Sequence, residues 1–177
     1  MPAPGGGHGP HRYGVRCHWS GSTGVGYESY DRAHAASAPP SLPELVLSSD
    51  PSFHGDSDLL NPEQLVVLAA ASCQLLSFLA VAARAKVDVL GYDDDGVGVM
   101  AEDDPPMRIT SISLRPIIRV APGTSEHRIK HLVEVAHREC FIANSLRANV
   151  DIEATVVIVP SEPRRGSAPP SGDRDRT

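Results

Sequence analysis

Residues 65–83 form an apolar run that only a few small or uncharged polar residues interrupt. Asn61 and Pro62 stand just before it, and they are a good helix cap and a residue suited to the first helical position. The pattern predicts a helix over residues 62–86, roughly 37 Å long, which is enough to cross a whole domain. A helix that is apolar on all sides is typical of the centre of a soluble fold.

The same run is almost long enough to cross a bilayer, which needs about 20 apolar residues. It is rich in alanine and has no aromatic residues at its two ends, unlike most membrane spans. These features favour a central helix and no membrane partner. A single-span membrane protein is the alternative that the length leaves open.

Alternating apolar and polar residues predict strands on both sides of this helix. A second helix is expected after Ser125, a plausible N-cap, with Cys140 on its apolar stripe. The expected strands cover residues 13–19, 25–36, 87–100, 108–120 and 150–158. The order of strand pair, helix, strand pair, helix and strand predicts an α+β fold with an antiparallel sheet.

The length of 177 residues predicts one domain, over residues 12–160, between disordered tails at residues 1–11 and 161–177. The net charge is −6 and aromatic residues make up 5%, so no nucleic-acid partner is expected. The start of the chain has no pattern of a secretory signal, and we expect a cytoplasmic protein.

Three cysteines are too few for a disulfide scaffold, and their spacing does not suit zinc, so no metal is expected. Cys17 falls on the apolar face of the first strand, where we expect a packed core thiol. Cys73 and Cys140 lie in two apolar helical segments, far apart in sequence. A buried thiol usually packs as a small hydrophobe, but two such thiols could form a redox couple.

A redox role for Cys73 requires nearby groups that lower the pKa of its thiol. The thiol lies about three turns into the helix, where the helix dipole has faded, and burial alone would raise its pKa. A reactive Cys73 therefore needs a nearby cation. Arg84 is roughly 16 Å away along the same helix and cannot reach, whereas Arg32 can reach across the fold from the second strand.

The residues around both cysteines resemble one known family. Asn61-Pro62-Glu63-Gln64-Leu65 with the small residues before Cys73, and Ala136-His137-x-x-Cys140 followed by Asn144-Ser145-Leu146, are similar to the motifs of the OsmC/Ohr thiol peroxidases. The segment Tyr30-Asp31-Arg32-Ala33-His34 looks like the OsmC-like branch. The resemblance covers residues 13–159.

The resemblance implies an intertwined homodimer, with sheets wrapped around two long central helices, that reduces organic hydroperoxides. It implies that Cys73 is the peroxidatic cysteine and that Cys140 resolves it as a disulfide, which an external dithiol reopens. Glu63 matches the glutamate that orients an arginine. Arg32 is our choice for that arginine, with Arg12 and Arg16 as rivals. No metal, flavin or haem cofactor is implied.

Because Glu63 is about 15 Å from Cys73 along an unbroken helix, either the helix start is bent or a second subunit supplies residues. Phe53, Phe78 and Phe141 are candidates to line an apolar pocket for the substrate, although core packing is the commoner fate of such rings. The alternative function is a non-enzymatic protein of the same fold. It would act as a redox switch or bind a small hydrophobic ligand.

Overall fold

The computed structural model describes residues 10–41, 43–103 and 105–160, so most of the two expected tails lies outside it. Within these ranges the chain forms two α-helices and three three-stranded sheets. The helices are α1 (Pro62–Arg84) and α2 (Glu126–Glu139). The strands are β1 (Arg16–His18), β2 (His34–Ser37), β3 (Leu45–Leu47), β4 (Val89–Asp93), β5 (Val97–Met100), β6 (Ile109–Leu114), β7 (Ile117–Val120), β8 (Asn149–Ile152) and β9 (Thr155–Ile158).

Helix α1 begins where the sequence predicts it. The side chain of Asn61 accepts a hydrogen bond from the Gln64 backbone N–H at 2.8 Å, and Gln64 Oε1 accepts one from the Asn61 N–H at 3.0 Å. This reciprocal capping satisfies two backbone donors that the first turn would otherwise leave unpaired. The helix ends at Arg84, and Lys86 takes a positive φ of 57° that directs the chain back toward β4.

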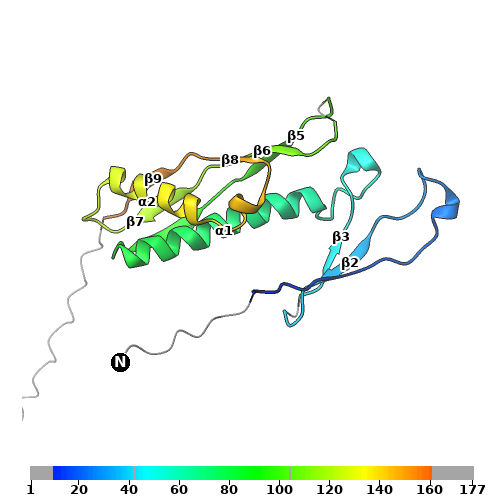
Figure 1. The fold of residues 1–177 in the computed structure, drawn as a ribbon, viewed down its shortest axis with the longest axis horizontal. Coiled ribbons are helices and arrows are strands. Elements are labelled where there is room, and N and C mark those ends of the chain that lie inside the picture. Colours follow the sequence, from blue (N-terminus) through cyan, green and yellow to red (C-terminus); the bar gives the residue numbers. More distant parts are fainter. Residues whose placement is uncertain (1–9, 42, 104, 161–177) are drawn as a thin grey trace, which may run out of the picture.

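Each long strand expected after α1 is divided in two by a bend. The parts join two different sheets, with strand orders β4-β7-β9 and β5-β6-β8 (Figure 1). The expectation of a purely antiparallel sheet is wrong, because β8 runs parallel to β6 and β9 runs parallel to β7. The segment between β7 and β8 contains α2 and is long enough to carry the chain back in the same direction.

The core lies between the helices and the two mixed sheets. Phe78 on α1 is completely buried among residues of α2 and of the β4-β7-β9 sheet, and a second cluster joins α1 to β6. Gln74 is buried between the helices, and its Nε2 donates to the Val133 carbonyl of α2 at 3.3 Å. Ser125 caps α2 as expected, since its side chain accepts a hydrogen bond from the Arg128 backbone N–H.

The sheet β1-β2-β3 lies apart, beyond the N-terminal end of α1 (Figure 1). The expected core position of Cys17 is wrong, since this thiol is exposed in β1. Tyr13 and Val15, predicted on the same apolar face, are 90% and 74% exposed. Alternation identified the apolar face, but within the described residues its first members, Tyr13 and Val15, stay largely uncovered.

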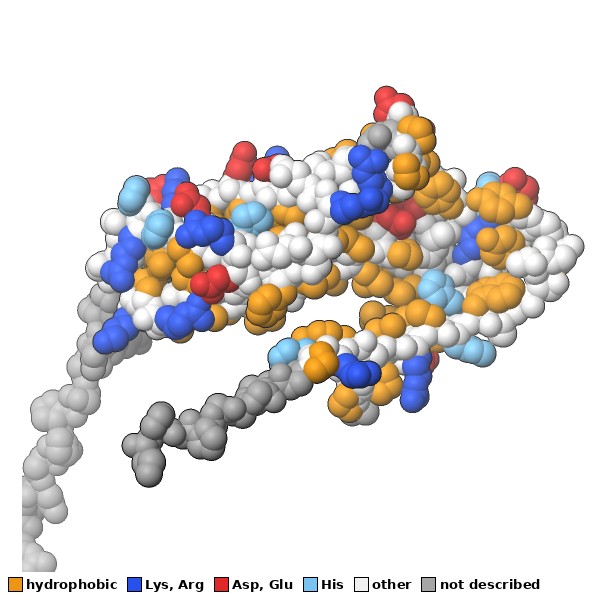
Figure 2. Space-filling view, in the orientation of Figure 1, with side chains coloured by type: hydrophobic (Ala, Val, Ile, Leu, Met, Phe, Trp, Pro, Cys, Tyr) orange, Lys and Arg blue, Asp and Glu red, His pale blue; other side chains and the backbone are white. Residues whose placement is uncertain are grey.

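One face of α1 is also uncovered. Leu68 and Leu76 are 56% and 63% exposed, and apolar side chains border the hollow between the N-terminal sheet and the rest of the molecule (Figure 2). Helix α1 is long and apolar enough to cross a membrane, and 28% of that apolar window is buried within the chain. Its other face packs on α2 and the sheets, as the core helix that the sequence predicts.

Candidate functional site: a pair of thiols

The packing of α2 on α1 brings Cys73 and Cys140 together. Cys73 lies in the middle of α1 and is partly accessible, whereas Cys140 is the C-cap of α2 and is 1% exposed. Both are free thiols, and the Cys140 side chain donates a hydrogen bond to Cys73. The two sulfurs that the sequence separates widely are therefore neighbours.

The turn after α2 positions the second thiol. The Asn144 side-chain amide donates to the Arg138 carbonyl at 3.0 Å, and the Ser145 hydroxyl donates to the Phe141 carbonyl at 2.7 Å. The first bond satisfies a carbonyl that the last turn of α2 leaves free, and the second fixes the turn just beyond the helix. The Ala143 backbone N–H then points at the Cys140 sulfur, with a nitrogen–sulfur distance of 3.5 Å.

The same turn activates Cys73. Burial raises the pKa of the Cys73 thiol, but hydrogen bonds from the Ile142 backbone, the Cys140 thiol and the Phe141 backbone lower it by more. A smaller contribution from Ser77 acts in the same direction. The pKa of Cys73 is therefore below its ordinary value. The groups that lower it are neutral donors, and the consecutive amides of Phe141 and Ile142 resemble an anion-binding nest.

The pKa of Cys140 is raised, whereas that of Cys73 is lowered. Burial raises the pKa of Cys140, the Ala143 N–H partly offsets this, and the contact with Cys73 raises it further. A donor that hydrogen-bonds a thiolate must keep its own proton. In this pair Cys140 is therefore the thiol that donates, and Cys73 is the sulfur that accepts. Near neutral pH, Cys73 holds the greater share of thiolate and Cys140 stays a thiol.

A cavity of about 790 Å³ opens beside Cys73. Its wall is mostly apolar and consists of residues from α1 and from the end of α2: Ala69, Ser72, Cys73, Leu76, Ser77, Ala80, Arg84, Arg138, Glu139, Phe141, Ile142 and Asn144. Phe141, a predicted pocket residue, is 80% exposed at this cavity. Arg84 also lines it, with its guanidinium paired to the Glu139 carboxylate at 2.7 Å.

The structure places Arg32 elsewhere. It lies just before β2 in the N-terminal sheet, and it is not among the residues that line the cavity of Cys73. Its guanidinium lies over the rings of Tyr30 and Tyr27, at 4.1 and 5.0 Å from their centroids. It also donates to the carbonyls of both tyrosines, at 2.7 and 2.6 Å. Within one chain, Arg32 is held rigidly but away from the thiols.

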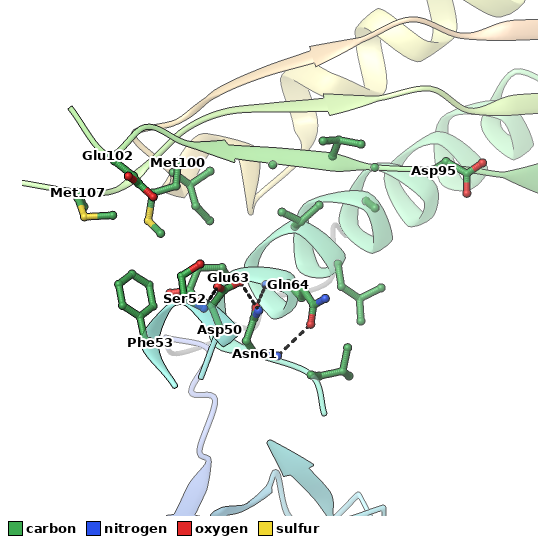
Figure 3. Close-up of a pocket in the computed structure, with 18 of the residues that line it drawn as sticks. Asp50, Ser52, Phe53, Asn61, Glu63, Gln64, Asp95, Met100, Glu102 and Met107 are labelled. Atoms are coloured by element: carbon green, nitrogen blue, oxygen red, sulfur yellow. Dashed lines mark hydrogen bonds between the residues drawn. The ribbon is translucent and has the colours of Figure 1, made fainter. Parts of the chain in front are cut away.

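Glu63 and Phe53 lie in a different cavity, of about 760 Å³, at the N-terminal end of α1 (Figure 3). Phe53 and Glu63 line one side of it, and Met100, Glu102 and Met107 lie on the other. This cavity shares no lining residue with the cavity of Cys73. The single chain therefore does not bring Glu63 to the thiol.

The expected role of Phe78 as a pocket residue needs correction. Its side chain has no exposed surface and packs with Val81, Ile118 and Ala136 in the core. Phe78 follows Cys73 by five positions on α1, so its ring points to the opposite, inner side of the helix. Among the residues that the structure describes, no group of three or more His, Cys, Asp and Glu side chains could hold a metal ion.

Sequence reasoning missed the groups that shift the pKa of Cys73. They are mainly backbone amides, and any residue type except proline at positions 141 and 142 would supply them. The only available signal was indirect. Asn144 and Ser145 are residues that favour turns, and they follow the second cysteine closely enough to predict a tight turn there.

The chain is similar to known proteins in sequence and in fold. A model of the OsmC-like protein family matches residues 55–155, which include both cysteines. The organic hydroperoxide resistance protein of Xanthomonas axonopodis pv. citri is 30% identical over 111 residues, which cover 56% of this chain and 68% of that protein.

Solved structures share the fold over a larger part of the chain. An OsmC-like protein of unknown function from Vibrio cholerae is 26% identical with a TM-score of 0.74, covering 82% of this chain and 100% of that one. An organic hydroperoxide resistance protein from Elizabethkingia anophelis is 18% identical with a TM-score of 0.64, covering 85% and 99%. The second likeness shows the fold alone.

Proposed function

Because the chain belongs to the OsmC family, we propose that it is a thiol-dependent peroxidase that reduces organic hydroperoxides. The family and the α+β fold expected from the sequence are confirmed. We assign the peroxide-reducing step to Cys73 and the resolving step to Cys140. The 30% identity to an organic hydroperoxide resistance protein supports this choice of substrate class.

One observation carries the proposal. Two contacting thiols have pKa values shifted in opposite directions, lower for Cys73 and higher for Cys140, and the lower one is at a mostly apolar cavity. A thiolate is the form that attacks a peroxide, and a neighbouring thiol is what converts the product to a disulfide. Two thiols that only packed in the core would not require one accessible thiol with a lowered pKa beside a buried thiol with a raised pKa.

The reaction follows from these positions. The Cys73 thiolate attacks one peroxide oxygen, the O–O bond breaks, and the alkoxide takes up a proton to leave as an alcohol. Cys73 is now a sulfenic acid. The Cys140 sulfur attacks the Cys73 sulfur, the S–O bond breaks, and water leaves once the hydroxide is protonated. An external dithiol reduces the disulfide and restores both thiols.

The test is a hydroperoxide pulse on the reduced protein. After one equivalent of an alkyl hydroperoxide, the mass should fall by that of two hydrogen atoms, and a Cys73–Cys140 peptide should be recovered after digestion. With an excess of a dithiol, alcohol should form over many turnovers. A disulfide that forms once without turnover under any dithiol would instead support the redox switch, and no disulfide would contradict both.

We also propose that the protein works as a homodimer. One face of α1 exposes Leu68 and Leu76, and the segment before β1 exposes Tyr13 and Val15. Exposed apolar residues that gather on one face mark an interaction surface. A second copy would cover both. It would also place Arg32, from its N-terminal sheet, where it can approach the thiol cavity. We keep the cytoplasm as the proposed location, since both thiols must be reduced to act.

A charge on the α1 face should separate the dimer. We expect Leu76→Asp to elute as a monomer in detergent-free buffer, because pairing would bury an uncompensated carboxylate. Light scattering after gel filtration measures the mass. Val157→Asp is the matched control, since Val157 is 40% exposed on β9, away from this face, and this variant should stay dimeric. A monomeric wild-type protein at micromolar concentration would contradict the proposal.

A further inference from the structure

The cavity beside Cys73 contains a serine hydroxyl next to the reacting sulfur. Ser77 lines this cavity together with Cys73, and its hydroxyl is within hydrogen-bonding reach of the Cys73 sulfur. The two residues are four positions apart on α1, and side chains at this spacing are neighbours on one face of a helix. The helix itself therefore holds Ser77 beside the sulfur.

The hydroxyl of Ser77 is not used by the helix backbone. A serine inside a helix commonly turns its hydroxyl back to the carbonyl four residues earlier, which here is the carbonyl of Cys73. Ser77 makes no such bond, and within the described ranges the Cys73 sulfur is the only hydrogen-bond partner of its hydroxyl. The residue is also partly accessible at the cavity. Its proton can therefore turn from the sulfur to a molecule bound there.

The charged side chains of the same cavity have other surroundings. Arg84 is roughly 16 Å from Cys73 along α1, and its guanidinium is paired with the Glu139 carboxylate. Arg138 precedes Cys140 by two positions, a spacing at which side chains on a helix do not face each other. Neither arginine is among the groups that shift the pKa of Cys73. The donors beside the sulfur are therefore uncharged, and Ser77 is the hydroxyl among them.

The reaction with a hydroperoxide needs a proton at the oxygen that leaves. As the Cys73 sulfur bonds to one peroxide oxygen, its negative charge passes to the other oxygen, which departs as an alkoxide. An alkoxide is a strong base, so a donor placed beside it lowers the barrier. The amides of Phe141 and Ile142 are fixed by the backbone and stay at the sulfur. A hydroxyl can rotate about one bond and follow the charge.

We propose that Ser77 is the proton donor to the leaving oxygen of the hydroperoxide. In the resting protein its hydroxyl donates to the Cys73 thiolate. When the sulfur–oxygen bond forms and the O–O bond breaks, the hydroxyl turns to the alkoxide and gives it a proton, so that an alcohol leaves. The serine oxygen recovers a proton from a water molecule of the open cavity, and solvent neutralises the hydroxide. This inference rests on the proposed peroxidase function and adds a catalytic residue to its first step.

The experiment compares two oxidants that differ in their need for a proton. An alkyl hydroperoxide loses an alkoxide, whereas peracetic acid loses acetate, a stable carboxylate that leaves without being protonated. Both oxidants react with the Cys73 thiolate, so the ratio of the two rate constants is insensitive to the share of thiolate. A Cys17→Ser background removes the exposed thiol. Reduced protein is mixed rapidly with each oxidant and quenched with N-ethylmaleimide, and mass spectrometry measures the Cys73 that remains reduced.

We expect Ser77→Ala to slow the reaction with the alkyl hydroperoxide at least about tenfold at pH 7, since a positioned proton donor commonly contributes about 100-fold or more and water replaces part of it. The reaction with peracetic acid should slow less than about threefold, because its leaving group needs no proton. Ser77→Thr keeps a hydroxyl and should restore most of the lost rate. Ser72→Ala removes the neighbouring serine of the cavity wall and should leave the ratio between the two oxidants unchanged.

Two outcomes would overturn the inference. The first is a Ser77→Ala variant that reacts with both oxidants at unchanged rates or is slowed equally with both, because the leaving oxygen then takes its proton from elsewhere. The second is the same selective loss in Ser72→Ala. Alanine is the best helix former, so α1 should keep its structure in both variants. The wild-type rate tests the proposed function separately, since an alkyl hydroperoxide that reacts no faster than with a free thiol contradicts that function and this inference together.

Discussion

Replacing Cys73 with serine is expected to abolish hydroperoxide reduction, with a loss of at least about 1,000-fold, because removing a nucleophile usually has an effect of that order or larger. A serine hydroxyl does not ionise near neutral pH, so the amides of Phe141 and Ile142 would have no thiolate to stabilise. Alcohol formation from an alkyl hydroperoxide, with a dithiol in excess, measures the loss. Cys73 is partly exposed, so the fold should be unaffected.

Cys140→Ser is the matched comparison, and it should lose activity only after the first turnover. The first equivalent of hydroperoxide should still be consumed, because Cys73 and its backbone donors remain. The sulfenic acid then has no neighbouring thiol to condense with and is oxidised further to the sulfinic acid. Mass spectrometry should show Cys73 with two added oxygens. Wild-type turnover in Cys73→Ser, or a rapid disulfide between other cysteines, would contradict the assignment.

The second large effect concerns stability. We expect Phe78→Ala to lower the free energy of unfolding by about 3–5 kcal/mol, the usual cost of removing a completely buried phenylalanine ring. The ring fills the space between α1, α2 and the β4-β7-β9 sheet, so its loss leaves a cavity where the two helices meet. Denaturant unfolding followed by circular dichroism measures the change.

Phe141→Ala makes the same deletion at a ring that is 80% exposed. Its cost should be below about 1 kcal/mol, because surface substitutions away from special features rarely exceed about 0.5 kcal/mol. Equal losses from the two variants would show that Phe78 is not part of the core. A loss of substrate affinity in Phe141→Ala, without a loss of stability, is what a residue of the thiol cavity should give.

The elements that the sequence predicts well are those that local chemistry determines. The start of α1 depends on neighbouring residues alone. Asn61 and Gln64 exchange hydrogen bonds within one turn, and Pro62 takes the first helical position. Ser125 begins α2 for the same reason. Alternation located the strands that follow α1, but not the bends that divide them at residues 94–96, 115–116 and 153–154. Before α1 it was less accurate, because only His34–Ser37 is a strand where residues 25–36 were expected to be one, and β3 was not expected. The parallel pairing of β8 and β9 depends on the crossover through α2 and could not be read from alternation.

In the candidate site, too, local features could be predicted and features that depend on the fold could not. The two cysteines could be identified from the sequence, since their motifs are local. The prediction that a reactive Cys73 needs a cation followed from its burial and from its distance to the helix start. The structure instead provides backbone amides, which have no sequence signature of their own. The roles of Arg32 and Glu63 stay predictions, because one chain holds Arg32 in the N-terminal sheet and Glu63 at a separate cavity.

Sequence alone determined the central helix, the family and the identity of the two thiols, because each depends on residues within a few turns of one another. Only the tertiary structure decided that the thiols touch, that Cys73 is the more acidic of them, and that Phe78 belongs to the core. The physical reason is that a pKa depends on burial and on donors that the fold gathers from distant segments. It is set by neighbours in space, and here the nearest donors come from residues 140–142.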